Sequence, residues 1–238
     1  MSKVHKIYYV LLKEFGPQGW WPVTEKGKIA PEYSNGPKNE TQQLEVIFGT
    51  ILAQNTSWKN AEKAIINLNR HKLVDAKKIL EIPDKELALI IRSSGYHNQK
   101  ARKLKNFCNF LKKYGYSLKN LFSLKLADLR EELLSINGIG PETANSIILY
   151  SAAKPLFVVD AYAKRIFSRI GFKEGTYDGL QDLFMNNLQK DASIFNEYHA
   201  LIVQHAKVYC KKIPACSSCP LRNGCASSPK GQASLRGF

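Results

Sequence analysis

The spacing of apolar residues restricts this chain to helices. Apolar side chains recur every three to four residues through most of the sequence, and no segment alternates apolar and polar residues as a half-buried strand does. The pattern therefore predicts an all-α fold. The expected helices cover residues 2–15, 41–54, 58–69, 84–94, 97–114, 126–135, 142–153, 160–170, 178–189 and 195–210.

Two segments depart from this helical pattern. Residues 16–39 are rich in Gly and Pro but also carry Trp20, Trp21 and Tyr33, which predicts a long ordered loop. Beyond Tyr209 the chain turns to Cys, Pro, Gly, Ser and Lys with almost no aliphatic residues. Such a tail cannot fold on a hydrophobic core, so it needs another source of stability.

Four cysteines in this tail supply a candidate. They are separated by five, two and five residues: Cys210, Cys216, Cys219 and Cys225. Four thiolates this close in sequence can surround one soft centre, either Zn²⁺ or a 4Fe–4S cluster. Structural zinc usually takes two close pairs of ligands, whereas only one close pair exists here. The spacing favours the cluster, with zinc and unliganded thiols as the alternatives. The fifth cysteine, Cys108, shares an apolar helix face and is expected in the core.

The charge balance indicates the kind of partner. The chain has 35 Lys and Arg against 20 Asp and Glu, a net charge of +15. This charge attracts polyanions, either nucleic acid or an anionic membrane surface. No apolar run approaches the ~20 residues of a membrane span, and the N-terminus has no signal-peptide pattern. We therefore expect an intracellular protein that does not enter a membrane, in which cysteines serve as ligands rather than in disulfides.

A glycine-rich turn separates two of the expected helices. Gly138 and Gly140 flank Ile139, and Pro141 suits the first turn of the helix that follows. Uncovered backbone amides beside a helix N-terminus can bind a phosphate of nucleic acid. An ordinary helix–helix turn is the alternative interpretation of the same residues.

An aspartate follows the next apolar run. Residues 156–159 are apolar and lead directly into Asp160 at the start of a basic helix. Asp is a preferred N-cap residue, and it is also a candidate catalytic carboxylate. The local sequence favours neither interpretation over the other.

Taken together, these motifs resemble the endonuclease III superfamily of helix–hairpin–helix DNA glycosylases. The similarity extends from about residue 43 to residue 225 and includes Asp160, which follows Glu142 by eighteen residues. The segments that carry it are Leu52-Ala53-Gln54-Asn55-Thr56, Gly95-Tyr96-His97-Asn98-Gln99-Lys100-Ala101, Gly138-Ile139-Gly140, Thr143-Ala144-Asn145, Val159-Asp160 and the four tail cysteines.

The resemblance implies a two-lobed helical fold with a C-terminal loop that holds a 4Fe–4S cluster. Residues 43–154 would form a helical-barrel lobe with the hairpin. Residues 1–42 and 155–238 would form the second lobe with the cluster region, and DNA would lie across the cleft. The expected partner is double-stranded DNA with a damaged base, bound by a monomer.

The resemblance also implies roles for single residues. Asp160 would stabilise positive charge on the sugar and orient water, after the target base has left the DNA stack. Glu142 occupies the position at which lyase members carry a lysine. A carboxylate cannot form a Schiff base, so the resemblance implies a monofunctional glycosylase.

DNA contacts follow from the same resemblance. Gln54 would fill the gap left by the base, Tyr96 would wedge against the opposite strand, and residues 138–140 would bind phosphate. Lys211 and Lys212 lie where the family has phosphate-binding basic residues. The cysteine loop that contains them has five residues, whereas the family usually has six.

The tryptophans indicate a branch of the superfamily. Trp20-Trp21-Pro22 and Trp58 are most similar to the 3-methyladenine DNA glycosylase III branch. Stacked indoles suit a positively charged alkylated purine, although Trp20 and Trp21 could equally anchor the loop. The alternatives are an endonuclease III-like glycosylase for oxidised pyrimidines or mismatched uracil or thymine, and a non-catalytic iron–sulfur protein that binds DNA.

Overall fold

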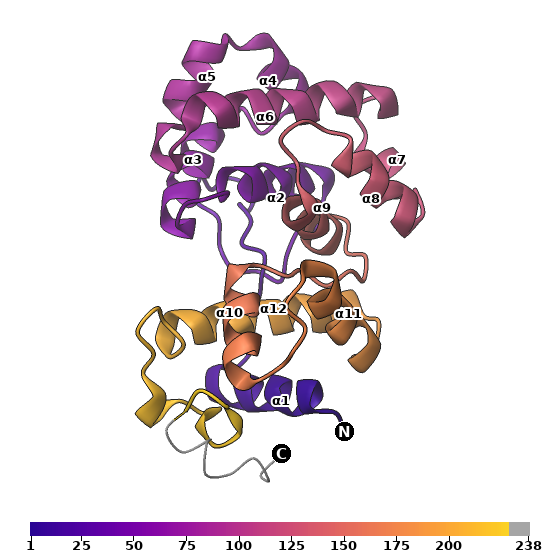
Figure 1. Ribbon diagram of the computed structural model, residues 1–238. Coiled ribbons are helices and arrows are strands. Elements are labelled where there is room, and N and C mark those ends of the chain that lie inside the picture. The colour runs from indigo at the N-terminus through magenta and orange to yellow at the C-terminus, as the bar shows by residue number, and fades with distance from the viewer. Residues whose placement is uncertain (229–238) are drawn as a thin grey trace. The chain divides into compact units, whose positions relative to one another are not determined.

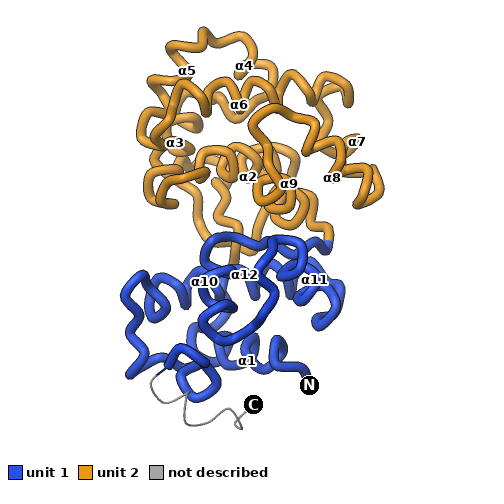
Figure 2. The backbone as a smooth tube through the Cα atoms, in the orientation of Figure 1, with its two compact units in different colours: residues 1–18, 155–238 blue, residues 19–154 orange. Residues whose placement is uncertain are grey.

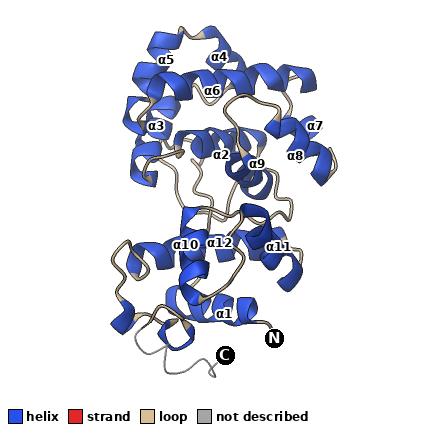
Figure 3. Cartoon of the chain, in the orientation of Figure 1, coloured by secondary structure: helices blue, strands red, loops and turns tan. Residues whose placement is uncertain are grey.

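Helices dominate the protein, as the apolar periodicity predicts. The computed structural model describes residues 1–228, and Figures 1 and 3 show helices joined by loops and turns. Within the described residues no β-strand forms, and the pairing of Val23 with Glu32 is an isolated antiparallel bridge. The all-α prediction is therefore confirmed. No helix among these residues has the length and apolar character to cross a membrane.

The chain divides into two compact units, shown in different colours in Figure 2. Unit 1 contains residues 1–18 and 155–238, of which 229–238 lie outside the described part, and unit 2 contains residues 19–154. The helices of unit 2 are α2 (Glu40–Leu52), α3 (Trp58–Arg70), α4 (Ala76–Glu81), α5 (Asp84–Ile90), η1 (Arg92–Ser94), α6 (His97–Phe110), η2 (Leu111–Tyr114), α7 (Leu118–Phe122), α8 (Leu126–Leu134), α9 (Pro141–Ser146) and η3 (Ile147–Ser151).

Helix α2 forms the centre of unit 2. The side chain of Asn39 caps its N-terminus by accepting a hydrogen bond from the N–H of Gln42 (3.0 Å). Every residue from Leu44 to Leu52 is buried, so this helix is covered on all sides. Helices α3, α6, α7, α9 and η3 all pack against it. This arrangement explains why α2 has little polar surface of its own.

Unit 1 has a separate aromatic core. Its helices are α1 (Lys3–Phe15), α10 (Ala161–Ile170), α11 (Tyr177–Asn187), α12 (Ala192–Val208), η4 (Cys216–Ser218) and η5 (Arg222–Gly224). The rings of Phe157 and Phe184 stack with centroids 3.7 Å apart, and Phe195 meets Phe157 edge-on. The buried hydroxyl of Tyr198 on α12 donates to the carbonyl of Val4 on α1 (2.8 Å). The first and last helices of the chain therefore share one core.

The structure differs from the predicted elements where helices are short or irregular. Helices α4 and α7 were not predicted, because six and five residues are too few to establish a helical period. The predicted helix 84–94 breaks into α5 and η1, and 97–114 ends in the 3₁₀ turn η2. The predicted helix 142–153 changes to π-helical geometry at Ile147.

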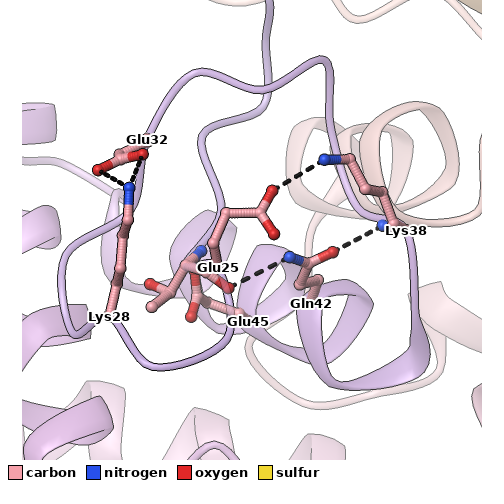
Figure 4. A network of polar contacts seen from close by, with 7 residues as sticks. Glu25, Lys28, Glu32, Lys38, Gln42 and Glu45 are labelled. Carbon is pink, nitrogen blue, oxygen red and sulfur yellow. Dashed lines mark hydrogen bonds and ion pairs between the residues drawn. The ribbon is translucent and has the colours of Figure 1, made fainter.

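Residues 19–42 pack within unit 2, although the sequence analysis groups them with the other lobe. Most of this segment is the long loop predicted between residues 16 and 39. Figure 4 shows the polar contacts that fix it. The loop pairs Lys28 with Glu32 (2.6 Å) and Lys38 with Glu25 (2.9 Å), and the amide of Gln42 accepts from the backbone N–H of Lys38 (2.8 Å).

A buried carboxylate joins this loop to two helices. Glu45 on α2 accepts hydrogen bonds from the backbone N–H of Thr24 (2.8 Å) and from the amide of Asn69 on α3 (3.1 Å). The same amide of Asn69 also donates to the carbonyl of Ile29 (3.1 Å). Burial raises the pKa of Glu45 above its ordinary value, and the hydrogen bonds from Asn69 and Thr24 offset this only in part.

We expect the raised pKa of Glu45 to make stability depend on pH. The folded protein holds this proton at pH values where the unfolded chain has lost it, so the associated stability falls as pH rises from about 4.5 through the folded pKa. In Glu45→Gln this contribution is absent. The wild-type advantage in the free energy of unfolding, measured with urea at several pH values, should shrink across that range. Glu32→Gln, at an exposed ion pair, is the control, and a pH-independent difference for Glu45→Gln would contradict the expectation.

Candidate functional site

The turn between α8 and α9 has the geometry of a tight hairpin. Gly138 has φ +96°, a conformation that side chains with a Cβ rarely adopt. A Cβ there would also lie 2.5 Å from Cγ of Lys103, so any side chain at this position would have to displace the lysine stem. The side chain of Ile139 is buried, and its N–H donates to the carbonyl of Ile136 (3.0 Å), which closes the turn. Gly140 is exposed in extended conformation and precedes α9.

Glu142 lies in the first turn of α9 and is exposed. A carboxylate at this end of a helix is favoured by the helix dipole. The position at which the resemblance implies a lysine in lyase members therefore carries an accessible negative charge beside the hairpin.

Gln54, which follows the C-terminus of α2, contacts this hairpin directly. Its side-chain N–H₂ donates to the carbonyl of Gly138 (3.2 Å) and to the hydroxyl of Thr143 on α9 (2.9 Å). Two residues that the sequence analysis selected separately, Gln54 and Gly138, thus meet in one place, although 84 positions separate them.

Tyr96 lies on the neighbouring turn, between η1 and α6. It has φ +46° and is 66% exposed, an unusual backbone conformation for a large aromatic residue. The buried ammonium of Lys100 donates to the carbonyls of Leu52 (2.8 Å) and Ser94 (2.7 Å), two residues before Gln54 and Tyr96 respectively. Burial, followed by repulsion from a neighbouring lysine, lowers the pKa of Lys100 to about 8. Sequence reasoning assigned Lys100 no role, because nothing local reveals its distant acceptors.

An aromatic cluster forms a second part of the candidate site in unit 2. Its predicted members are Trp20, Trp21, Pro22 and Trp58. The ring of Trp21 meets that of Trp58 edge-on, with ring centroids 5.3 Å apart. The ring of Tyr150 is tilted against both Trp21 and Trp20, at centroid distances of 4.8 and 6.1 Å respectively. Trp21 also lies against Gly49 of α2, where a Cβ would come within 3.3 Å of its indole nitrogen. The sequence analysis missed Tyr150, which lies on the π-helical segment η3.

Asp160 caps α10 in unit 1. Its Oδ1 accepts a hydrogen bond from the N–H of Ala163 (2.7 Å), and its Oδ2 lies 3.5 Å from Nε2 of His199. Burial by itself raises the pKa of Asp160. Attraction to His199, their hydrogen bond, and the backbone N–H groups of Ala163 and Tyr162 outweigh burial, so the net pKa is below its usual value. Oδ1 of Asp160 therefore caps the helix, as the capping interpretation predicts. The lowered pKa favours the ionised form of this carboxylate.

The four tail cysteines surround one small cavity in unit 1. The cavity of ≈50 Å³ is lined by Cys210, Cys216, Cys219 and Cys225 together with residues of α10 and α12. Burial, together with a smaller contribution from the three other cysteines, raises the pKa of Cys219 to about 11, although a backbone hydrogen bond from Leu221 opposes the rise. Within residues 1–228, no three His, Cys, Asp or Glu side chains are placed to hold a single metal ion. All four tail cysteines therefore lie at one common cavity.

Two arginines of α10 hold the start of this tail. The guanidinium of Arg165 donates to the carbonyl of Cys210 (3.0 Å), and that of Arg169 donates to the carbonyls of Lys211 (2.6 Å) and Lys212 (3.0 Å). The side chains of Lys211 and Lys212 are exposed. Sequence reasoning missed both arginines, although their spacing of four residues places them on one helix face. Cys108 is fully buried, as predicted.

Comparison with known proteins identifies the family. Residues 48–190 match the HhH-GPD superfamily of base excision DNA repair proteins. A protein of Methanocaldococcus jannaschii named as a candidate DNA repair glycosylase, MJ1434, is 44% identical over 94% of this chain and 96% of its own. The chain belongs to the HhH-GPD superfamily. This HhH-GPD protein is an endonuclease III-like DNA glycosylase, which confirms the enzyme class and the resemblance inferred from the sequence.

Further relatives agree with this assignment. Endonuclease III of Thermotoga maritima is 29% identical over 79% of this chain and 86% of its own. The solved structure of H. pylori 3-methyladenine DNA glycosylase bound to 1,N6-ethenoadenine is 26% identical, with a TM-score of 0.67 over 87% of this chain and 98% of that one. An endonuclease III–DNA complex, at 21% identity and a TM-score of 0.73 over 100% of both chains, shares the fold.

Proposed function

We propose that this HhH-GPD protein is a monofunctional glycosylase that removes an alkylated purine from double-stranded DNA by hydrolysis. The observation that carries the hydrolytic mechanism is the position of Asp160, whose Oδ1 accepts a hydrogen bond from the N–H of Ala163 and whose pKa lies below its usual value. Cleavage of the N-glycosidic bond builds positive charge on the sugar. A nearby carboxylate stabilises that charge and orients the attacking water.

The identity of Glu142 supports hydrolysis without strand cleavage. Lyase chemistry needs an amine that attacks the sugar and forms a Schiff base, with the bond to the base broken in the process. A carboxylate cannot do this. The product we propose is therefore released base and an intact strand with an abasic site.

The aromatic cluster supports an alkylated purine as substrate. Indole and phenol rings attract a cationic, electron-poor base through cation–π and stacking interactions. The likeness to H. pylori 3-methyladenine DNA glycosylase supports the same substrate class. The likeness to Endonuclease III of Thermotoga maritima favours a second candidate, an enzyme for oxidised pyrimidines or mismatched uracil or thymine.

The DNA contacts we propose follow the family pattern. The backbone of half-buried Gly138 and exposed Gly140 would bind phosphate, with buried Ile139 anchoring the turn in the core. Gln54 would fill the gap left by the base, and the exposed ring of Tyr96 would wedge against the opposite strand. Lys211 and Lys212, exposed on the tail, would contact phosphate through charge.

The spacing of the four tail cysteines supports a 4Fe–4S cluster rather than zinc. Tetrahedral zinc draws four sulfurs to about 2.3 Å from one ion. Structural zinc usually takes its ligands as two close pairs, whereas this tail has one close pair, and all four cysteines line a common cavity. In this proposal Cys210, Cys216, Cys219 and Cys225 hold a cluster that stabilises the tail in place of an apolar core.

Asp160→Asn should separate catalysis from folding. Asn is as good an N-cap as Asp, so the variant retains the hydrogen bond to Ala163 but loses the negative charge. We expect single-turnover excision to fall by about 10²–10³-fold, with DNA affinity retained. Asp191→Asn, at the exposed cap of α12, is the matched control and should excise normally. Equal excision by the Asp160 variant and the wild type would exclude a catalytic role.

A panel of duplex oligonucleotides, each with one lesion, tests the substrate and the product. We expect the fastest excision from alkylated purines, with strand breaks that appear only after alkali, because the enzyme leaves the sugar in place. Borohydride should trap no protein–DNA complex, while a lyase serves as positive control. Faster release of oxidised pyrimidines, or of mismatched uracil or thymine, would favour the second candidate. Robust trapping would refute the monofunctional mechanism.

The cluster proposal predicts the metal content. Protein purified without oxygen should be brown and contain iron and acid-labile sulfide in equal amounts, with little zinc. Cys216→Ser should lose both elements together, whereas Cys108→Ser, in the core of unit 2, should retain them. Stoichiometric zinc without sulfide would show that the site is a zinc site instead.

A further inference from the structure

The side-chain amide of Gln54 is hydrogen-bonded at both ends. Its N–H₂ donates to Gly138 and Thr143 as described above, and its Oε1 accepts from the ammonium of Lys103 (2.5 Å). A primary amide offers one carbonyl acceptor and two N–H donors, so these contacts use both functions of the group. Gln54 is thereby held against the hairpin rather than extended from it.

Lys103 reaches Gln54 by a constrained path. It lies on α6, and its aliphatic stem passes over the hairpin, where Cγ and Cδ lie 2.5 and 2.9 Å from the position of a Cβ at Gly138. A side chain at that position would force the lysine stem out of this path. The same residue that permits the tight turn therefore permits the contact between Lys103 and Gln54.

Lys103 also borders an open, mainly basic hollow. The hollow of ≈730 Å³ is lined by Asp84, Gln99, Arg102, Lys103, Lys105, Asn106 and Asn137. Asp84, its single acidic residue, pairs with Lys105 (2.6 Å). The remaining charge comes from Arg102 and Lys103, so the hollow attracts an anion such as a backbone phosphate.

We propose that Lys103 is a positioning residue that releases Gln54 when the protein engages a DNA phosphate. In the DNA-free protein its ammonium holds the carbonyl oxygen of Gln54. A backbone phosphate that enters the hollow competes for the ammonium, and a hydrogen bond between two charged groups is stronger than one to a neutral amide. Gln54 is then free to leave the hairpin. The role of Gln54 in filling the gap rests on the proposed function, but the competition for Lys103 does not.

Affinity for an undamaged duplex, measured at several salt concentrations, tests this competition. If Lys103 moves to a phosphate, Lys103→Met should lower the slope of log affinity against log salt by about 1. Lys103→Arg should retain the slope, because it retains the charge. Lys112→Met is the control for net charge, because it deletes one exposed positive charge on η2. This variant should also retain the wild-type salt slope.

Gln54→Ala should strengthen the binding of undamaged DNA, whereas Lys103→Met removes a contact with phosphate. Gln54→Ala removes the internal competitor for Lys103, so undamaged DNA should bind roughly threefold more tightly at an unchanged salt slope. A fixed structural brace would predict weaker binding for both variants. An unchanged slope in Lys103→Met, or weaker binding by Gln54→Ala, would overturn the proposal. If Lys103→Met fails to fold, the direction of the affinity change in Gln54→Ala still distinguishes the proposal from a fixed structural brace.

The readout also separates this inference from the proposed function. Undamaged DNA contains no lesion, so the measurement requires no excision and no gap for Gln54 to fill. If no lesion in the oligonucleotide panel is excised, the proposed function fails while the salt slopes still report on Lys103. If excision proceeds and the slopes do not change, only the proposed release of Gln54 by Lys103 fails.

Discussion

The complete burial of α2 is the constraint on which the candidate site in unit 2 depends. Because this helix is buried on all sides, several segments of unit 2 can pack against it, and some of them carry candidate site residues. Glu45 fixes the loop that carries the tryptophans, and Gly49 provides the surface on which Trp21 rests. At the C-terminal end, the carbonyl of Leu52 accepts from buried Lys100, just before Gln54. Displacement of α2 would therefore disturb the aromatic cluster and the hairpin contacts together.

In unit 1 the C-terminal tail has almost no apolar side chains, so polar contacts hold it in place of a hydrophobic core. Arg165 and Arg169 bind backbone carbonyls at the start of this tail, and the thiols converge on one cavity beside the same helix. The N-terminus of that helix is capped by Asp160. One helix thus connects the candidate catalytic carboxylate to the cysteine loop. The tail can therefore serve a structural role by supporting the helix that Asp160 caps, although the proposed chemistry involves no electron transfer.

Sequence reasoning succeeded where the signal is local and periodic. The long helices, the tight turn at Gly138, and the buried Cys108 all follow from residue type and spacing within one segment. It failed where a contact joins distant segments. Lys100, Lys103 and Tyr150 have no unusual local context, and their partners lie on other elements. The sequence pattern also gives no sign that residues 19–42 pack within unit 2, because the anchors of this segment, Glu45 and Asn69, lie on α2 and α3.

The charges around the hairpin explain why a carboxylate can be tolerated there. Glu142 favours the helix through its dipole, but it repels a phosphate that approaches the turn. Arg102 and Lys103 on α6 provide positive charge at the neighbouring hollow, and the net charge of +15 adds a long-range attraction. A lysine at position 142 would supply both an attacking amine and a phosphate contact. In this chain α9 carries no lysine, and Arg102 and Lys103 on α6 place positive charge near the hairpin instead.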